Sequence, residues 1–323
     1  MKNFDDIRKL LAADLAKTDA VLVSRLSSNI TLINQMSNYI IGAGGKRLRP
    51  LLLLLCAKAS GYTGAHQHLM AVVIELIHTA TLLHDDIVDK SSTRRGKDTA
   101  NEVWGNAPSV LVGDFLYSRA FEMMVETGSM QIMQLLSKTT NNIAEGEVLQ
   151  LLNCQNPALT QEQYFEVIER KTACLFQAAT QIGGILSGVN KAQESALRDY
   201  GLHLGYAFQI IDDLLDYQAD SQTIGKEIGD DLAEGKTTLP MIYALENTSG
   251  ADKKLLIQAI KNADNTNINK VIEVLDGAGA FAYTRKTAQK ASELAKQSLS
   301  KIANSEYKNA LILLCDLSLQ RTS

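Results

Sequence analysis

Proline is scarce in this chain of 323 residues, with only four present. An average composition would contain about 5% proline. Because proline breaks the interior of a helix, the long proline-free stretches leave room for long helices. The sequence therefore permits a fold dominated by helices.

Cysteine is equally scarce, and Cys56, Cys154, Cys174 and Cys315 are far apart and form no C-x-x-C pair. Three of them lie in apolar segments with helical periodicity, which favours reduced thiols packed in a core. Disulfide frameworks and cysteine-rich metal sites are not expected.

The chain also lacks a basic surplus, with 32 lysines and arginines against 36 aspartates and glutamates and a net charge of −4. Nucleic acid is therefore not an expected partner. The apolar run Leu51–Ala57 is closed by Lys58 and is too short to span a bilayer. The first residues contain no apolar stretch typical of a signal peptide. We expect a cytoplasmic protein without a transmembrane segment.

Hydrophobic residues make up 46% of the chain and charged residues 21%, an ordinary globular balance that excludes wholesale disorder. Apolar residues recur with helical spacing, and no alternating strand or hairpin signal is evident. Length suggests about two domains, but no long linker divides the chain. We predict a single all-α domain over residues 1–323, with helices near 5–26, 47–60, 65–89, 108–126, 129–153, 160–187, 191–218 and 279–303.

Two segments, LLHDDIVD at 82–89 and FQIIDDLLD at 208–216, each contain Asp-Asp-x-x-Asp. The 20 aspartates of this chain would produce about 0.08 such motifs by chance. The first triplet is Asp85, Asp86 and Asp89, and the second is Asp212, Asp213 and Asp216.

Residues i and i+4 share one face of a helix, about 6 Å apart along its axis. Asp85 and Asp89 should therefore point together, as should Asp212 and Asp216. Like charges at this spacing destabilise a helix, and a bound cation removes that cost. Carboxylate oxygens with open positions suit Mg²⁺, which is often bridged by substrate phosphates. Two solvated acidic helix faces are the alternative.

A phosphate ligand needs cations, and several lie in glycine-containing or loop-like stretches near both motifs. Arginine grips phosphate oxygens with two donors, and lysine adds a point charge. Each basic residue alone could be explained as a solvated surface residue. Together they indicate sites that bind a diphosphate. They are Lys46, Arg47 and Arg49 before a helix, Arg94 and Arg95 after the first motif, Lys171 beside Thr172, and Lys226 and Lys236 after the second motif.

His78 lies seven residues before Asp85, on nearly the same helical face, and could contact phosphate or substrate. It also completes Glu75-x-x-His78, a spacing found in di-iron helical bundles. Those bundles need a second Glu-x-x-His, which no other histidine of the chain provides. A di-iron site is therefore disfavoured.

Together these residues resemble the trans-isoprenyl (polyprenyl) diphosphate synthases over nearly the whole chain, from GKRLRP at 45–50 to EGKTTLP at 234–240. Within that family the chain most resembles the long-chain, octaprenyl-type members. The resemblance implies an all-α bundle around a deep central cavity, assembled as a homodimer. Its substrates would be isopentenyl diphosphate and an allylic diphosphate such as farnesyl diphosphate.

The resemblance also implies roles at matching positions. About three Mg²⁺ ions would be held by Asp85, Asp89, Asp212 and Asp216. The isopentenyl diphosphate would bind Lys46, Arg49, His78 and Arg95, and the allylic diphosphate would bind Arg94, Lys171, Thr172, Gln209, Lys226 and Lys236. The residues expected to act in catalysis are Asp85, Asp86, Asp89, Asp212, Asp213, Lys171 and Lys226.

Product length should depend on the helix that carries Asp85, because the growing tail would run along it. In the family, bulky aromatics near this motif close the cavity early, whereas Ala80 and Thr81 are small here. The helix extends about 30 Å back from Asp85 to Ala65. Met123 and Met124 are the candidates for the floor of the cavity, although core packing is the alternative for at least one of them. A long product is therefore expected, and a quinone side chain is its natural use.

Four other functions stay open at this point. A terpene cyclase of the same fold needs one allylic substrate, and the basic loop at 45–50 argues for two. A shorter-chain farnesyl or geranylgeranyl diphosphate synthase differs only in product length. A regulatory subunit of a heteromeric synthase would be expected to lack the aspartates, and both motifs are intact. A helical scaffold without activity is the weakest alternative.

Overall fold

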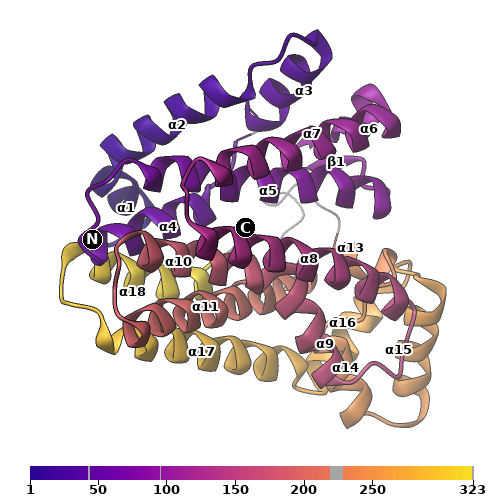
Figure 1. Cartoon of the computed structure of the whole chain (residues 1–323). Coiled ribbons are helices and arrows are strands. Elements are labelled where there is room, and N and C mark those ends of the chain that lie inside the picture. The colour runs from indigo at the N-terminus through magenta and orange to yellow at the C-terminus, as the bar shows by residue number, and fades with distance from the viewer. Residues whose placement is uncertain (43, 95, 219–227, 322–323) are drawn as a thin grey trace. The chain divides into compact units, whose positions relative to one another are not determined.

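The computed structural model describes residues 1–42, 44–94, 96–218 and 228–321. It divides into two compact units, which are described separately. Unit 1 comprises residues 1–140, 175–201 and 298–314, and unit 2 comprises residues 141–174, 202–297 and 315–323. Helices dominate both units (Figure 1), which confirms the predicted all-α class.

Each of the eight segments predicted to be helical contains one or more helices with similar bounds. In the first part of the chain they are α1 (Phe4–Leu10), α2 (Ala12–Leu26), α3 (Thr31–Gly42), α4 (Leu48–Ala59), α5 (His66–Val88), α6 (Ala100–Trp104), α7 (Asn106–Val125) and α8 (Met130–Asn153). Next come α9 (Gln161–Ile168), the π-helical turn η1 (Glu169–Ala173), α10 (Cys174–Leu186) and α11 (Lys191–Gln218). The last part contains α13 (Asp230–Ala233), α14 (Leu239–Asn247), α15 (Gly250–Asn262), α16 (Ile268–Gly277), α17 (Ala280–Ser298), the short 3₁₀ helix η2 (Leu299–Lys301) and α18 (Glu306–Leu319).

Several shorter helices were not predicted, among them α3, α14, α15, α16 and α18. α14 shows one physical reason. Pro240 lies in its first turn, where a missing N–H costs nothing because that group has no partner within the helix. Proline therefore opens this helix rather than interrupting it.

One short hairpin forms for which the sequence shows no signal. β1 (Thr93–Arg94) pairs antiparallel with β2 (Lys97–Asp98), and the left-handed φ of +73° at Gly96 permits the turn between them. Strands of two residues are too short to produce an alternating pattern in the sequence. This small hairpin follows the first aspartate motif directly.

The core of unit 1 is built around α4, α5 and α7. Residues 50–57 of α4 are all buried, so the apolar run seen in the sequence forms a core helix. α5 is also largely buried along its length and packs against α2, α4 and α7. Burial on this scale fixes the direction of α5 and therefore the position of the aspartates at its end.

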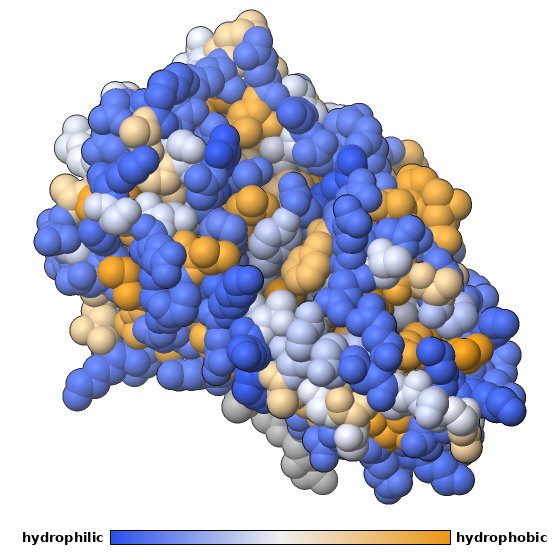
Figure 2. Space-filling model, turned by 90° about the horizontal axis from the view of Figure 1, so that it is seen from below, coloured by the Kyte–Doolittle hydropathy of each residue, from blue (hydrophilic) through white to orange (hydrophobic). Residues whose placement is uncertain are grey.

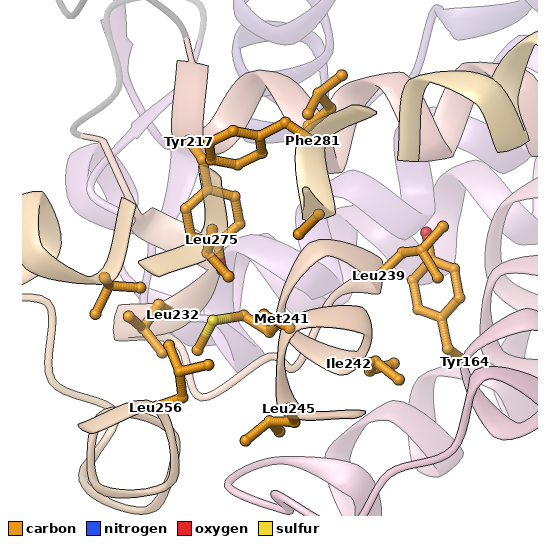
Figure 3. Close-up of a cluster of buried hydrophobic side chains, with 14 of the residues drawn as sticks. Tyr164, Tyr217, Leu232, Leu239, Met241, Ile242, Leu245, Leu256, Leu275 and Phe281 are labelled. Carbon is orange, nitrogen blue, oxygen red and sulfur yellow. The ribbon is translucent and has the colours of Figure 1, made fainter. Parts of the chain in front are cut away.

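The core of unit 2 gathers residues from six helices around α14 (Figure 3). Leu239, Met241, Ile242 and Leu245 of α14 are all buried there. Figure 3 shows Tyr164 of α9 beside Leu239, so an aromatic ring that carries a hydroxyl group belongs to this apolar cluster. A buried hydroxyl needs a hydrogen-bond partner, which the site below supplies.

The described cysteines are all free, and Cys56, Cys174 and Cys315 are buried, in agreement with the prediction. On the face drawn in Figure 2, hydrophobic residues form separate groups among hydrophilic ones. Among the helices of the described ranges, none has the length and apolar character needed to cross a membrane.

Candidate active site

The first aspartate motif lies at the C-terminal end of α5. Asp85 and Asp86 belong to the last turn, and the Asp89 N–H donates to the Asp85 carbonyl at 2.8 Å. The chain is therefore still helical across the motif, as predicted, and Asp85 and Asp89 are one turn apart. Both are partly accessible, whereas Asp86 is only 4% exposed.

Asp86 has a different environment because the hairpin returns Arg94 to it. Arg94 donates from Nε to the Asp86 Oδ1 at 2.7 Å, and its Nη2 lies 2.6 Å from the same oxygen. Burial acts to lower the pKa of Arg94, but the hydrogen bond and charge of Asp86 outweigh it and raise the pKa. Asp86 therefore orients a charged guanidinium beside Asp85 and Asp89.

Two of the residues predicted to bind isopentenyl diphosphate come together in unit 1. Arg49, in the first turn of α4, has its Nη1 3.0 Å from the Nε2 of His78 on α5. Its guanidinium also lies 4.5 Å from the centre of the Phe176 ring. Lys46 is exposed in the loop before α4. The stacked, hydrogen-bonded Arg49 is thus held in one orientation, whereas Lys46 is accessible to solvent.

The second aspartate motif occupies the last two turns of α11. The Asp212 side chain is 48% exposed, and its Oδ1 lies 3.1 Å from the Nη2 of Arg321. The guanidinium of Arg321 also stacks 4.2 Å from the centre of the Phe208 ring. Asp216 accepts a hydrogen bond from the Asp231 N–H at 3.4 Å, which connects α11 to α13.

Unit 2 contains a pocket of about 120 Å³ beside this second motif. Its lining includes five residues predicted from the sequence: Lys171, Thr172, Gln209, Asp213 and Lys236. They come from η1, α11 and the loop before α14. The remaining lining residues are Gln150, Asn153, Leu159, Tyr164, Val167, Ile168, Asp231, Thr237 and Thr238.

A chain of hydrogen bonds fixes the polar wall of this pocket. Thr172 Oγ1 donates to Gln209 Oε1 at 3.0 Å, and Gln209 Nε2 donates to Asp213 Oδ1 at 2.7 Å. The Tyr164 hydroxyl donates to the other Asp213 oxygen at 2.5 Å. Both carboxylate oxygens are therefore engaged, and the Gln209 amide is held in one orientation.

Asp213 is only 3% exposed, and burial raises its pKa to about 8, with the charge of Asp231 adding to the rise. The hydrogen bonds from Tyr164 and Gln209 oppose this shift. Burial, together with Asp213, likewise raises the pKa of Tyr164 far above its usual range. Negative charge at Asp213 is thus costly unless donors or cations surround it.

The two described lysines of the pocket each have an acidic neighbour. Lys171 Nζ lies 2.5 Å from Glu147 Oε2 on α8, and Lys236 pairs with Glu234. Both lysine side chains are less than one fifth exposed. An anion entering the pocket would therefore meet cations whose positions are already fixed.

The residues predicted to set product length all lie in unit 1. Ala80 on α5 and Met123 on α7 are fully buried. Thr81 is half-buried, and its hydroxyl donates to the His78 carbonyl at 2.8 Å. Two further predicted site residues, Arg95 and Lys226, lie outside the described residues.

Sequence reasoning did not identify Tyr164, Glu147, Asp231 or Arg321. Tyr164 looks like an ordinary apolar position of an amphipathic helix, and Arg321 lies near the C-terminus in no motif. Asp231 follows Asp230 between Lys226 and Lys236, and only these two lysines of the segment were predicted to bind a ligand. The single available signal was Glu145-Gly146-Glu147, a pair of acids around a helical glycine.

The two aspartate motifs suit a divalent cation by their chemistry. In residues 1–42, 44–94, 96–218 and 228–321, no three His, Cys, Asp or Glu side chains are grouped so that they could hold a metal ion alone. Mg²⁺ commonly uses one or two carboxylates and completes its shell with waters and substrate phosphates. Asp85 and Asp89 are partly accessible and Asp212 is exposed, so each motif offers carboxylate oxygens that fit this pattern.

The hydroxyl of Tyr164 should stabilise the folded chain through Asp213. Replacing Tyr164 with Phe leaves a buried carboxylate oxygen without this donor, which should cost about 1–3 kcal/mol of unfolding free energy. Tyr283→Phe is the matched control, since it removes a hydrogen bond of 2.7 Å to a neutral amide, Gln161. Urea unfolding measures both, and equal losses would contradict the importance assigned to the Tyr164–Asp213 contact.

Comparison with known proteins places this site in a family. A model described as polyprenyl synthetase matches residues 30–276. The octaprenyl diphosphate synthase of Escherichia coli K12 is 46% identical over 320 residues, which cover 99% of each chain. An all-trans-nonaprenyl-diphosphate synthase (geranyl-diphosphate specific) of Rhodobacter capsulatus is 44% identical over 317 residues, or 98% of this chain and 97% of that one.

A solved structure agrees with these matches. It is a polyprenyl synthase from Caulobacter crescentus CB15, complexed with calcium and isoprenyl diphosphate, with a TM-score of 0.96 and 42% identity. The match covers 100% of this chain and 99% of that one. The family model spans most of the sequence, and the two relatives match 99% and 98% of this chain. The chain therefore belongs to the polyprenyl synthetase family, with the all-α isoprenoid synthase fold that its motifs predicted.

Proposed function

We propose that this member of the family is a long-chain trans-prenyltransferase that adds isopentenyl diphosphate units head-to-tail to an allylic diphosphate, giving octaprenyl diphosphate. Its full-length similarity to octaprenyl diphosphate synthases supports the long-chain activity. The observation that carries the proposal is the pocket of unit 2, where Lys171, Thr172, Gln209 and Lys236 line one cavity with Asp213.

The allylic diphosphate would bind in this pocket. Lys171 and Lys236 would neutralise its charge, and Thr172 and Gln209 would contribute a hydroxyl and an amide. Arg94 and Lys226 would add further cations. Because the lysines are held by acidic neighbours, their positions should change little on binding, which lowers the cost of reorganisation.

The isopentenyl diphosphate would bind the cations around the start of α4. Arg49 is fixed by His78 and by the Phe176 ring, and it would supply a planar fork for phosphate oxygens. The exposed Lys46 would close on the bound anion. Arg95, which lies outside the described residues, completes the proposed set.

About three Mg²⁺ ions would be held by Asp85 and Asp89 in unit 1 and by Asp212 and Asp216 in unit 2. Bound Mg²⁺ would neutralise the diphosphate and stabilise it as a leaving group. Asp86 would hold Arg94, and Asp213 would hold Gln209, so the middle aspartate of each motif acts by positioning a neighbour. This division follows the burial of Asp86 and Asp213.

In the reaction, the allylic C–O bond breaks heterolytically. The diphosphate leaves with the electron pair, and a carbocation forms on the allylic carbon. The double bond of isopentenyl diphosphate attacks that cation, and a proton is then lost to the released diphosphate. The new chain has a trans double bond and carries the diphosphate of the added unit. Each cycle therefore regenerates an allylic diphosphate one isopentenyl unit longer.

The growing tail would run along α5, past the small side chains of Ala80 and Thr81. Met123, which is buried in α7, would form the floor. The tail is apolar, so its burial favours a long product until the space is filled. The long product suits the synthesis of a quinone side chain.

We further propose that residues 1–323 act as one domain, because the family model extends through parts of both units. A homodimer is the expected assembly. The similarity to long-chain synthases over the full chain favours this activity over a short-chain synthase or a terpene cyclase. Both aspartate motifs are intact, which argues against a regulatory subunit.

Metal dependence can be tested by removing one carboxylate at a time. Asp85→Ala and Asp212→Ala should each lower turnover by several orders of magnitude, because the leaving group loses its cation. The control is Asp252→Ala, an exposed aspartate in the first turn of α15. Helix content is followed by circular dichroism. Near-normal turnover in either motif variant, with Mg²⁺ varied from zero to saturation, would refute the metal assignment.

The two diphosphate sites should be separable by steady-state kinetics. Lys46→Ala should raise KM for isopentenyl diphosphate, and Lys236→Ala should raise KM for the allylic substrate. Losing one charge-assisted contact costs roughly 1.5–3 kcal/mol, or about 10- to 150-fold. Each variant is the control for the other. Equal changes of the same KM in both would show that the proposed division is wrong.

Product length offers a third test, read as a ladder of products by chromatography. Ala80→Phe or Thr81→Phe should shorten the product while the first condensations continue, because the carboxylates are unchanged. Met123→Ala should lengthen it. Met124→Ala is the matched control, since it is equally buried but is rotated by about 100° on the helix. An unchanged ladder in the Phe variants would mean that the tail takes another route.

A further inference from the structure

The segment that carries Lys171 and Thr172 is not an ordinary helix. α9, η1 and α10 form one continuous helix, but its middle turn, Glu169–Ala173, is π-helical. The Cys174 N–H donates to the Glu169 carbonyl, five residues earlier, where an α-helix would use four. Such single π turns are rare and occur frequently at functional sites.

One side of this turn is held by α8. Arg170 Nη1 donates to Glu145 Oε2 at 2.5 Å, and Lys171 Nζ lies 2.5 Å from Glu147 Oε2. The residue between these two acids is Gly146. A Cβ atom at Gly146 would lie 2.7 Å from the Lys171 backbone nitrogen, a distance that real Cβ atoms essentially never show.

α11 holds the turn in the same way. The Tyr206 hydroxyl donates to Glu169, and Thr172 Oγ1 donates to Gln209 at 3.0 Å. Gly205 directly precedes Tyr206, and a Cβ there would lie 2.6 Å from the Cα of Ala173. Both glycines thus face backbone atoms, which cannot rotate away as a flexible side chain could.

Neither glycine is required by its own backbone, because both lie within regular helices and neither has a positive φ. Alanine would be favoured at both positions by about 1 kcal/mol of helix propensity. Alanine is excluded at both positions because its Cβ would overlap the backbone of the π turn that packs against each glycine. α8 and α11 therefore each have a glycine where the π turn packs against them. Each glycine is next in sequence to a side chain that contacts the turn: Glu145 and Glu147 beside Gly146, and Tyr206 beside Gly205.

We propose that Gly146 and Gly205 are positioning residues that hold the Glu169–Ala173 turn in its π form and so aim Lys171 and Thr172 at the allylic diphosphate. The inference rests on the proposed function of the pocket. Removing the extra residue of a π turn rotates the following part of a helix by roughly 100°. Lys171 could then no longer contact Glu147 while Thr172 contacts Gln209.

The test uses the variants Gly205→Ala on α11 and Gly146→Ala on α8. The control is Gly201→Ala, which lies on α11 together with Gly205. A Cβ at Gly201 would lie 2.6 Å from the Phe176 carbonyl oxygen, in the regular α-helical part of α10. All three variants therefore force a methyl group against a helix, but only two force it against the π turn. Melting temperature and helix content follow folding in each.

Two functional readouts are measured: kcat and KM for each substrate, and the Kd for inorganic diphosphate with Mg²⁺ by calorimetry. We expect Gly205→Ala and Gly146→Ala to lower kcat/KM for the allylic substrate by about 100-fold, the cost of displacing a binding group by 1 Å. The KM for isopentenyl diphosphate should change little, and diphosphate should bind more weakly. Gly201→Ala should lose stability without this selective effect.

Two results would overturn the inference: an equal kinetic effect of Gly201→Ala, or unchanged diphosphate affinity in both π-turn variants that fold. If the Gly205→Ala variant does not fold, the same measurements on the Gly146→Ala variant of α8 still test the inference. A wild-type chain that binds diphosphate but transfers no prenyl group would refute the proposed function alone. The loss of that binding in the two glycine variants would still support their positioning role.

Discussion

The accumulation of carboxylates at the C-terminal ends of two long helices is the constraint on which the surroundings of each aspartate motif depend. Asp85 and Asp86 lie in the last turn of α5, and Asp216 lies in the last turn of α11. Backbone carbonyls already give a helix end partial negative charge, so each added anion there costs about 0.3–1 kcal/mol. The like charges at i and i+4 add to this cost. A stable chain must offset it with fixed donors and cations.

The structure supplies such groups at the most buried carboxylates. Asp86 is matched by Arg94, which the short hairpin returns to it, and Asp213 receives donors from Tyr164 and Gln209. Asp85, Asp89 and Asp212 are more accessible. The buried aspartates thus organise the protein side of the site, and the accessible ones are left able to meet a cation from solvent.

Much of this could be predicted from the sequence, because the signals were local. Helical periodicity located α5 and α11, and the i, i+4 rule correctly placed Asp85 one turn from Asp89. Lys171, Thr172, Gln209 and Lys236 were all grouped as ligands of one anion, and the structure brings them to one pocket. Their roles in binding stay predictions.

The features that could not be predicted depend on contacts between distant segments. Tyr164 is an apolar helix position until its hydroxyl is found 2.5 Å from Asp213, which is 49 residues later in the chain. The π turn at Glu169–Ala173 depends on room left by Gly146 and Gly205, and nothing in its own sequence requires it. α14 has only 9 residues and a proline in its first turn, and the hairpin of β1 and β2 is too short to show a pattern.

We propose that these carboxylates and cations are arranged to bind a magnesium–diphosphate complex. Differential scanning calorimetry of the full chain with Mg²⁺ alone, inorganic diphosphate alone, and both together tests it most directly. A ligand that binds only the folded state at 100 times its Kd adds about 2.7 kcal/mol of stability. We expect Mg²⁺ and diphosphate together to raise the melting temperature by more than the sum of their separate effects. A melting temperature that is unchanged by the pair, at concentrations up to the millimolar range, would contradict it.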